Sequence, residues 1–150
     1  MTPEEIAQRS VEAMLQRDAF SAWLGITASG IAPGRAITRM TVRAEMLNGF
    51  GVCHGGVTFS LADSALAFAS NTSGVVSVSI DNSISYPTPV KLGDVLTAQA
   101  ESEGGSERLG FFKVTVTRGD GAVVALFRGT TYRTKTPLEF DAPANPASNV

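Results

Sequence analysis

The segment that follows Gly55 and Gly56 most constrains the fold, because it is apolar nearly all round. Residues 57–70, VTFSLADSALAFAS, contain no Gly, Pro, Lys or Arg, which favours a helix of about four turns. Drawn as a helix, the segment has Val57, Leu61 and Phe68 on one side and Phe59 and Leu66 roughly opposite. A helix that is apolar on every side is a buried helix. The rest of the chain must therefore surround this segment.

One charged residue, Asp63, stands in the second or third turn of this predicted helix. Burying a carboxylate costs free energy unless the group is paired, hydrogen-bonded or used in chemistry. Such a conflict between a residue and its predicted surroundings is typical of functional sites. A structural aspartate held by backbone or serine groups is the alternative, and the helix alone does not decide between the two.

The segments around this helix are predicted to be one more helix and six strands. Residues 2–5, TPEE, form a capping box with a proline in the first turn, which predicts a helix over residues 3–18. Phe20, Trp23 and Leu24 are then expected to pack this segment against the body. The predicted strands are 24–31, 35–43, 75–86, 94–103, 109–118 and 122–134. Because strands and helices do not alternate, we expect an α+β fold whose antiparallel sheet curls around the buried helix.

Length and composition indicate one globular domain with a short tail. The chain has 150 residues and is 43% hydrophobic, enough for a single core. We assign residues 1–134 to this domain. Residues 135–150 are rich in Pro, Ala and Asn, and are predicted to form a mostly disordered tail.

Charge and cysteine content argue against several functions. The net charge of -2 without a basic run argues against nucleic-acid binding. The only cysteine and the only histidine, Cys53 and His54, are adjacent, so no disulfide and no zinc-ligand spacing exists and no metal is expected. The polar amino terminus does not resemble a signal peptide, and no apolar run is long enough to span a membrane. These features predict a cytoplasmic protein that acts without a metal ion.

The glycine pair before the buried helix suggests a binding role for backbone groups. The first N–H groups of a helix have no partner inside the helix and lie at the positive end of its dipole. They can bind an anion or stabilise a developing oxyanion. Glycines that only permit a tight turn are the alternative. No GKS or GKT follows, so a phosphate-binding loop of the Walker type is disfavoured.

Nucleophilic catalysis by serine or cysteine is poorly supported. A serine triad would need His54, and no GxSxG motif is present. Cys53 fits a small buried residue better than a nucleophile. By contrast Asn48, His54, Gly55 and Asp63 lie within sixteen residues and provide an amide, an imidazole, oxyanion donors and a base. Acyl transfer to water requires such a set.

Three stretches of the chain resemble the hotdog-fold acyl-CoA thioesterases. They are NGFGVCHGG followed by LAD between residues 48 and 63, SVSIDNSISYPTPVKLGD over 77–94, and ALFRGTTYR over 125–133. The last stretch is most similar to the PaaI-type enzymes of phenylacetic acid degradation. The resemblance implies a sheet of about six antiparallel strands wrapped around one long central helix. It also implies hydrolysis of phenylacetyl-CoA or a ring-hydroxylated phenylacetyl-CoA, with coenzyme A as part of the substrate and no separate cofactor.

The resemblance further implies roles for five residues and for a second subunit. Asp63 matches the catalytic carboxylate, which acts as general base or as nucleophile, and Gly55 matches the backbone N–H that polarises the thioester carbonyl. His54 and Asn48 match residues that orient the thioester or the water, and Ser79 matches a residue that holds the water. Asp63 is expected to come from the subunit opposite the one that supplies Gly55, in a homodimer or homotetramer with its sites at subunit interfaces.

Other expectations remain open at this stage. Five basic residues are available for the coenzyme A phosphates, and nothing selects among them: Lys91, Arg108, Lys113, Arg128 and Arg133. Leu47, Phe50 and Phe59 are candidates for the acyl pocket. A hydratase on the same fold would need a different pairing of Asp and His. A non-catalytic acyl-CoA-binding regulator would normally carry a DNA-binding segment, for which the 22 residues before Trp23 are too short.

Overall fold

The computed structural model describes residues 1–144, which form a sheet of six strands with three helices. The elements are α1 (Pro3–Arg17), α2 (Ala19–Leu24), β1 (Thr27–Ala32), β2 (Arg35–Thr41), the short 3-10 helix η1 (Ala44–Met46), α3 (Gly55–Ser70), β3 (Val75–Ser85), β4 (Val95–Gly105), β5 (Leu109–Arg118) and β6 (Val123–Pro137). None of the helices within residues 1–144 is long and apolar enough to cross a membrane.

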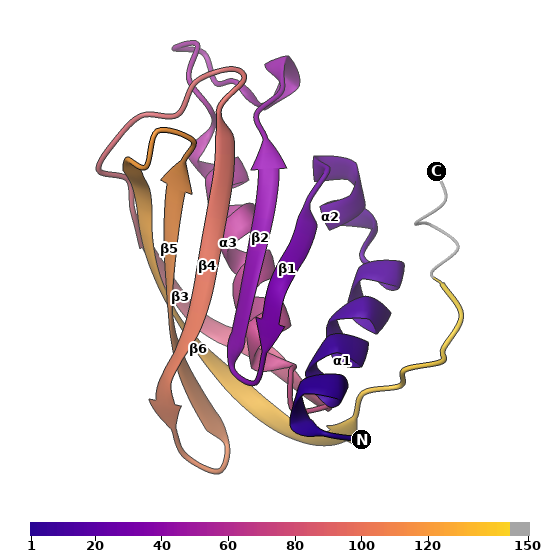
Figure 1. The fold of residues 1–150 in the computed structure, drawn as a ribbon. Coiled ribbons are helices and arrows are strands. Elements are labelled where there is room, and N and C mark those ends of the chain that lie inside the picture. Colours follow the sequence, from indigo (N-terminus) through magenta and orange to yellow (C-terminus); the bar gives the residue numbers. More distant parts are fainter. Residues whose placement is uncertain (145–150) are drawn as a thin grey trace.

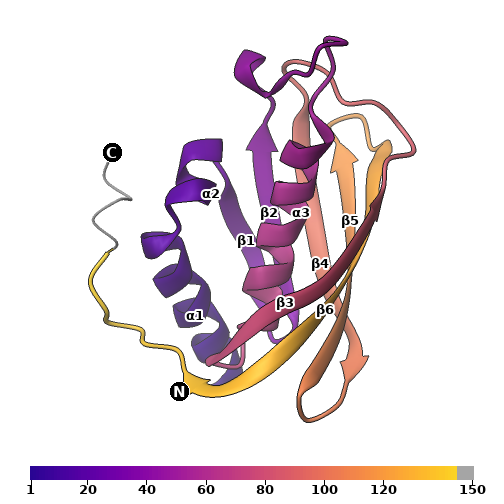
Figure 2. The ribbon, with the colours of Figure 1, turned by 180° about the vertical axis from the view of Figure 1, so that it is seen from behind.

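The six strands form one antiparallel sheet in the order β1-β2-β4-β5-β6-β3. Seen from behind, α3 lies across one face of the curved sheet, and β3 and β6 bend around it (Figure 2). α1 and α2 lie beside β1 at the edge of the sheet (Figure 1), and α2 contacts α3 through Ser21 and Ser64. The predicted fold, an antiparallel sheet wrapped around one long helix, is confirmed.

The core forms between α3 and the inner face of the sheet. Leu61, Leu66 and Phe68 of α3 are completely buried. The sheet contributes alternating residues that include Leu96, Val114, Val116 and Phe127. Burying a side chain of this size stabilises the fold by about 1.5–3 kcal/mol. β2 contributes its alternating residues Ala36, Thr38 and Met40, which are buried against the core.

The amino-terminal region differs from the prediction after its first helix. The capping box of α1 is present, with Thr2 and Glu5 each bonded to the other's backbone N–H. The predicted strand over residues 24–31 is wrong at its start, because the Asp18 side chain caps the extra helix α2 and Gly25, at φ 75°, ends it. Only Leu24 of the three predicted packing residues is buried. Phe20 and Trp23 stack on each other at the surface, 53% and 64% exposed.

Strand β3 does not follow the simple alternation that its sequence suggests. In the first half of the strand Ser77 is buried, whereas Val78 and Ile80 are exposed. The polar side of this half therefore faces the core. The pairing with β6 shifts register between Ser79 and Asp81, and a bulge of this kind redirects the side chains that follow. β3 is also an edge strand of the sheet, with one side of its backbone unpaired by any other strand of residues 1–144.

The first part of the predicted tail is ordered in the structure. β6 continues to Pro137, beyond the predicted end at residue 134. The Leu138 N–H then donates to the Gly74 carbonyl. The Arg9 guanidinium lies over the Phe140 ring, with its Cζ 4.9 Å from the ring centroid. Contacts with α1 and the loop before β3 thus hold this segment in place. Residues 145–150 of the predicted tail lie outside the described part of the chain.

Candidate active site

The loop before α3 is shaped by the side chains of Asn48 and His54. The Asn48 Oδ1 accepts hydrogen bonds from the N–H groups of Phe50 and Val52 at 2.9 and 3.3 Å. His54 is the N-cap of α3, and its Nδ1 accepts from the Gly56 N–H at 3.0 Å. A neutral imidazole that accepts at Nδ1 carries its proton on Nε2. The Nε2–H of His54 is therefore the donor that this ring can offer to a bound molecule.

The first N–H group of α3 belongs to Gly55 and makes no hydrogen bond within residues 1–144. The next two N–H groups are satisfied, because Gly56 donates to His54 Nδ1 and Val57 donates to the His54 carbonyl. A free N–H at the positive end of a four-turn helix attracts negative charge that develops nearby. The free donor at this helix start is the Gly55 N–H, the group that the resemblance assigns to the thioester carbonyl.

Asp63 is half-buried in the middle of α3, with one side-chain partner. The Asn82 Nδ2 donates to its Oδ1 at 3.4 Å. Burial raises the pKa of the Asp63 carboxyl, and the negative charge of Asp18 adds to this rise. A carboxylate whose pKa is raised is a stronger base than an exposed aspartate.

Asn82 and Ser79 reach Asp63 because of the bulge in β3. The Ser79 hydroxyl donates to the Asn82 Oδ1 at 2.8 Å, so Ser79 acts on Asp63 through Asn82. Gly129 of β6 provides the room for this arrangement. A Cβ at that position would lie 2.7 Å from the Asn82 Oδ1 and 2.5 Å from the Leu66 Cδ2. The glycine of the ALFRG stretch is thus required by the packing around Asp63.

Ser60 and Ser64 of α3 have structural partners. The Ser60 hydroxyl donates to the Gly56 carbonyl at 2.7 Å. The buried Ser64 hydroxyl lies 3.0 Å from that of Ser21 in α2. Both hydroxyls are thus engaged in contacts within the fold, in line with the absence of a GxSxG motif from the sequence. Burial raises the pKa of the Cys53 thiol, which disfavours the thiolate that a nucleophilic cysteine needs.

Within one chain, the predicted site residues fall into two clusters. The helix-start cluster consists of Asn48, His54 and Gly55, and the Asp63 cluster consists of Asp63, Asn82 and Ser79. Gly55 and Asp63 are eight residues apart on one helix, which separates their backbones by about 12 Å along the axis. A water bound to Asp63 therefore cannot attack a carbonyl bound to the Gly55 N–H of the same chain.

Sequence reasoning missed two residues that contact these clusters. Asn82 is the partner of Asp63, and the Tyr86 hydroxyl donates to the Gly55 carbonyl at 2.7 Å. Both belong to the stretch 77–94 that carries the resemblance. Their contacts span 19 and 31 residues, so no pattern of neighbouring residues pointed to either.

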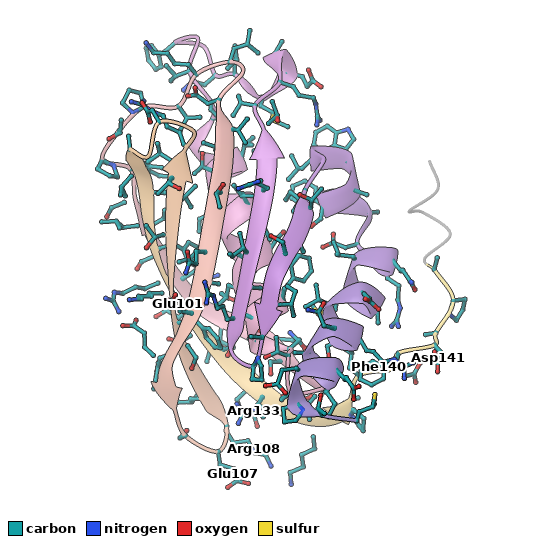
Figure 3. All side chains as sticks on the ribbon, in the orientation of Figure 1. Glu101, Glu107, Arg108, Arg133, Phe140 and Asp141 are labelled. Carbon is teal, nitrogen blue, oxygen red and sulfur yellow. The ribbon has the colours of Figure 1, made fainter. Side chains whose placement is uncertain are left out.

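The candidate phosphate-binding residues are mostly engaged with their own chain. Lys113 and Arg128 pair with Glu101 and Glu103 across the sheet. Arg108 and Arg133 lie together with Glu107 near the turn between β4 and β5, where they bond to backbone carbonyls (Figure 3). The Lys91 ammonium makes no ion pair within residues 1–144. Lys91 is therefore the candidate that a phosphate would engage without breaking an internal contact.

The candidate acyl-pocket residues occupy different environments. Phe50 is 93% exposed at the tip of the loop before α3. Phe59 packs edge-on against the Phe127 ring, with centroids 5.3 Å apart, and Leu47 packs against the core. Among the described residues, no three His, Cys, Asp or Glu side chains gather as metal ligands would.

Comparison with protein families and curated proteins gives consistent matches. Residues 50–125 match the family model described as the Thioesterase superfamily. The chain is 39% identical over 127 residues to the acyl-coenzyme A thioesterase PaaI of Escherichia coli, covering 85% of this chain and 91% of that protein. It is 36% identical over 126 residues to the human acyl-coenzyme A thioesterase 13, covering 80% and 89%.

A solved structure agrees with the sequence relatives. The structure of the E. coli PaaI protein from the phenylacetic acid degradation operon superposes on this chain with a TM-score of 0.89. The superposition covers 92% of this chain and all of that one, at 36% identity. The similarity therefore includes the sheet, α3 and most of the segments that carry the two clusters.

Proposed function

Because the chain belongs to the Thioesterase superfamily and is an acyl-coenzyme A thioesterase, we propose that it hydrolyses phenylacetyl-CoA or a ring-hydroxylated phenylacetyl-CoA. The observation that carries the mechanism is the pair of groups on α3, a free N–H at Gly55 and a carboxylate at Asp63. The preference for an arylacetyl group rests on the similarity to the E. coli protein of the phenylacetic acid degradation operon.

In this proposal the Gly55 N–H binds the thioester oxygen. Negative charge develops on that oxygen as the carbonyl carbon becomes tetrahedral, and a fixed donor at a helix N-terminus stabilises it. The neighbouring Nε2–H of His54 and the amide of Asn48 orient the thioester or the water. The Asn48 Oδ1 already holds the loop, so its Nδ2 is the group available to a ligand.

Asp63 activates the water in the same step. As a general base its carboxylate removes a proton from water while the oxygen attacks the carbonyl carbon. The C–S bond then breaks, and the coenzyme A thiolate leaves and is protonated. As a nucleophile it would instead form an anhydride that water cleaves. Asn82 and Ser79 orient the carboxylate or the water in either route.

A complete site requires two copies of the chain, since about 12 Å of helix separate Gly55 from Asp63 within one copy. We propose a homodimer in which Gly55 of one subunit faces Asp63 of the other. The edge strand β3 offers the joining surface, because its backbone is unpaired on one side and its Val78 and Ile80 side chains are exposed. Two such dimers would form the tetramer.

The activity test combines one carboxylate variant with a matched pair at Gly55. Asp63→Asn should abolish thiol release from phenylacetyl-CoA. Gly55→Pro removes the N–H, and proline is tolerated here because position 55 starts a helix and His54 already has extended backbone angles. Gly55→Ala adds the same Cβ and keeps the N–H, so the rate ratio between the two variants isolates the donor. Full activity of Asp63→Asn would overturn the mechanism.

The two-subunit site has a test of its own. Asp63→Asn and Gly55→Pro subunits are each expected to be inactive as homodimers. A hybrid dimer contains one subunit of each variant. Because each site takes Gly55 from one subunit and Asp63 from the other, one site has both changes and the second site has neither. After refolding an equal mixture, about a quarter of wild-type activity should return. No recovery from a mixture that contains hybrid dimers would contradict the shared site.

Substrate preference is measured with a panel of thioesters. We expect phenylacetyl-CoA to show a higher kcat/KM than acetyl-, hexanoyl- and benzoyl-CoA. A clear preference for a straight-chain thioester would leave the thioesterase assignment in place and refute the arylacetyl preference. Tight binding of every thioester without turnover would instead favour a non-catalytic acyl-CoA-binding protein.

A further inference from the structure

The peptide unit between Gly55 and Gly56 is held at both of its ends by side chains. Its carbonyl oxygen accepts from the Tyr86 hydroxyl at 2.7 Å, and its N–H donates to the His54 Nδ1 at 3.0 Å. Because a peptide unit is planar, hydrogen bonds at its oxygen and its nitrogen together restrict the orientation of the whole plane. Tyr86 and His54 therefore act together on one peptide plane.

The adjacent peptide unit carries the free Gly55 N–H. Its direction relative to the held plane depends on the backbone angles of Gly55, and glycine restricts these angles less than any other residue. Two successive glycines would leave the start of α3 with more conformational freedom than an oxyanion donor can have. A hydrogen bond from outside the helix reduces that freedom without adding a Cβ.

We propose that Tyr86 is a positioning residue for the thioesterase reaction, whose hydroxyl fixes the Gly55 carbonyl and so aims the free Gly55 N–H at the substrate oxygen. This inference rests on the proposed function, in which that N–H is the oxyanion donor. Tyr86 acts through Gly55 and needs no contact with the substrate.

The contact between Tyr86 and Gly55 is close as well as hydrogen-bonded. A Cβ at position 55 would lie 3.1 Å from the Tyr86 Cζ and hydroxyl oxygen. The absence of a side chain at Gly55 therefore allows the tyrosine ring to lie against the helix start. Partial burial raises the pKa of Tyr86, so the hydroxyl keeps the proton that it donates.

Because Tyr86 is exposed to solvent, its hydrogen bond to Gly55 is expected to position the helix start more than it stabilises the fold. The side chain is 48% exposed, so its hydroxyl could bond to water if the Gly55 carbonyl were not there. Exchanging such a bond for a bond to water changes folding stability little. A bond from water to the Gly55 carbonyl would not fix the direction of the Gly55 N–H, because water is free to move.

Steady-state kinetics of Tyr86→Phe provide the first test. The other tyrosine of the chain, Tyr132 in β6, gives the matched control Tyr132→Phe. We expect kcat to fall about tenfold in Tyr86→Phe, less than the 10²–10³-fold loss on removing an oxyanion donor itself. The KM should change by less than about twofold, since the substrate contacts remain. Tyr132→Phe should match the wild type.

Vibrational spectroscopy of a bound thioester provides a readout that does not depend on turnover. Phenylacetyl-CoA labelled with ¹³C at its carbonyl is bound to Asp63→Asn, and the carbonyl stretching frequency is measured by infrared difference spectroscopy. A donor aimed at the oxygen lowers this frequency. Adding Tyr86→Phe should move the band back towards its value in water and broaden it, whereas adding Tyr132→Phe should not.

The outcomes separate the inference from the function on which it rests. Unchanged kcat in Tyr86→Phe with an unmoved carbonyl band would overturn the positioning role and leave the thioesterase mechanism intact. Full activity of Asp63→Asn would overturn the mechanism, while the kcat comparison between the two tyrosine variants would still decide the role of Tyr86. Thermal unfolding fixes an assay temperature below the transitions of all variants, so that a lowered Tm cannot be mistaken for lost positioning.

Discussion

The hydroxyl groups of Ser21 and Ser64 lie 3.0 Å apart in the interior and join α2 to the turn of α3 that carries Asp63. Ser21 also donates to the Asp18 carboxylate, at 2.6 Å. This chain of contacts fixes a second carboxylate, Asp18, close enough to Asp63 to raise its pKa. The short helix that the sequence did not predict thus influences the proposed catalytic group.

Replacing Asp18 by Asn is expected to shift the pH dependence of catalysis. Asparagine caps helices as well as aspartate does, so α2 should persist. Removing the negative charge lowers the pKa of Asp63, and the acidic limb of kcat/KM should move to lower pH because the base stays ionised further into acid. Glu12→Gln, an exposed change on α1, should leave the profile unchanged. An unmoved limb in Asp18→Asn would refute the electrostatic link.

Asp63→Asn is expected to be inactive and more stable than the wild type at neutral pH. Since folding raises the pKa of this carboxyl, the folded chain binds the proton more tightly than the unfolded chain. The group therefore favours folding below its unfolded-state pKa, and this contribution is lost as pH rises through the folded-state pKa. The Tm difference between variant and wild type should grow over that pH range.

Gly129→Ala is expected to lower both stability and activity. The new Cβ would lie 2.5 Å from the Leu66 Cδ2 and 2.7 Å from the Asn82 Oδ1, so one of them must move. Overpacking of this kind costs about 1–3 kcal/mol of unfolding free energy, measurable by denaturant titration. Gly119→Ala adds a Cβ in open space and serves as control. A Gly129→Ala variant as stable as the wild type would contradict this expectation, because it would show that β6 can move to make room for the new Cβ.

Asn82→Ala is expected to reduce kcat more than it raises KM. The change removes the side-chain donor of Asp63 and frees the Ser79 hydroxyl, while leaving the helix-start cluster intact. Loss of one hydrogen bond to a charged group corresponds to about 1.5–3 kcal/mol, or roughly a tenfold or greater fall in rate. Steady-state kinetics decide the matter, and an equal kcat would assign Asn82 a structural role only.

Ile80→Lys is expected to separate the subunits and abolish activity. A lysine on an exposed edge strand opposes pairing with a second strand, and the shared site cannot form in a monomer. Analytical ultracentrifugation together with thiol release measures both effects. Leu92→Lys, an equally exposed change away from β3, should remain associated and active. An active monomer of Ile80→Lys would contradict the two-subunit site.

The sequence was sufficient wherever the decisive pattern is local. The all-round apolar segment from Val57 to Ser70 predicted the buried α3, and the capping box predicted the start of α1. The glycine pair after His54 indicated the start of α3, where the Gly55 N–H is free and the Gly56 N–H is bonded to His54. The conflict between Asp63 and its apolar neighbours pointed to a half-buried carboxylate with a raised pKa. Each of these inferences depends on residues within a few turns of one another.

Only the tertiary structure decided which distant groups meet, because such contacts depend on bulges, caps and strand register. The bulge between Ser79 and Asp81 brought Asn82 to Asp63, and the chain that leaves β3 brought Tyr86 to Gly55. Both contacts join residues that lie far apart in the sequence. The sequence thus determined which chemical groups this protein has, and the packing of α3 in the curved sheet determined how they are grouped.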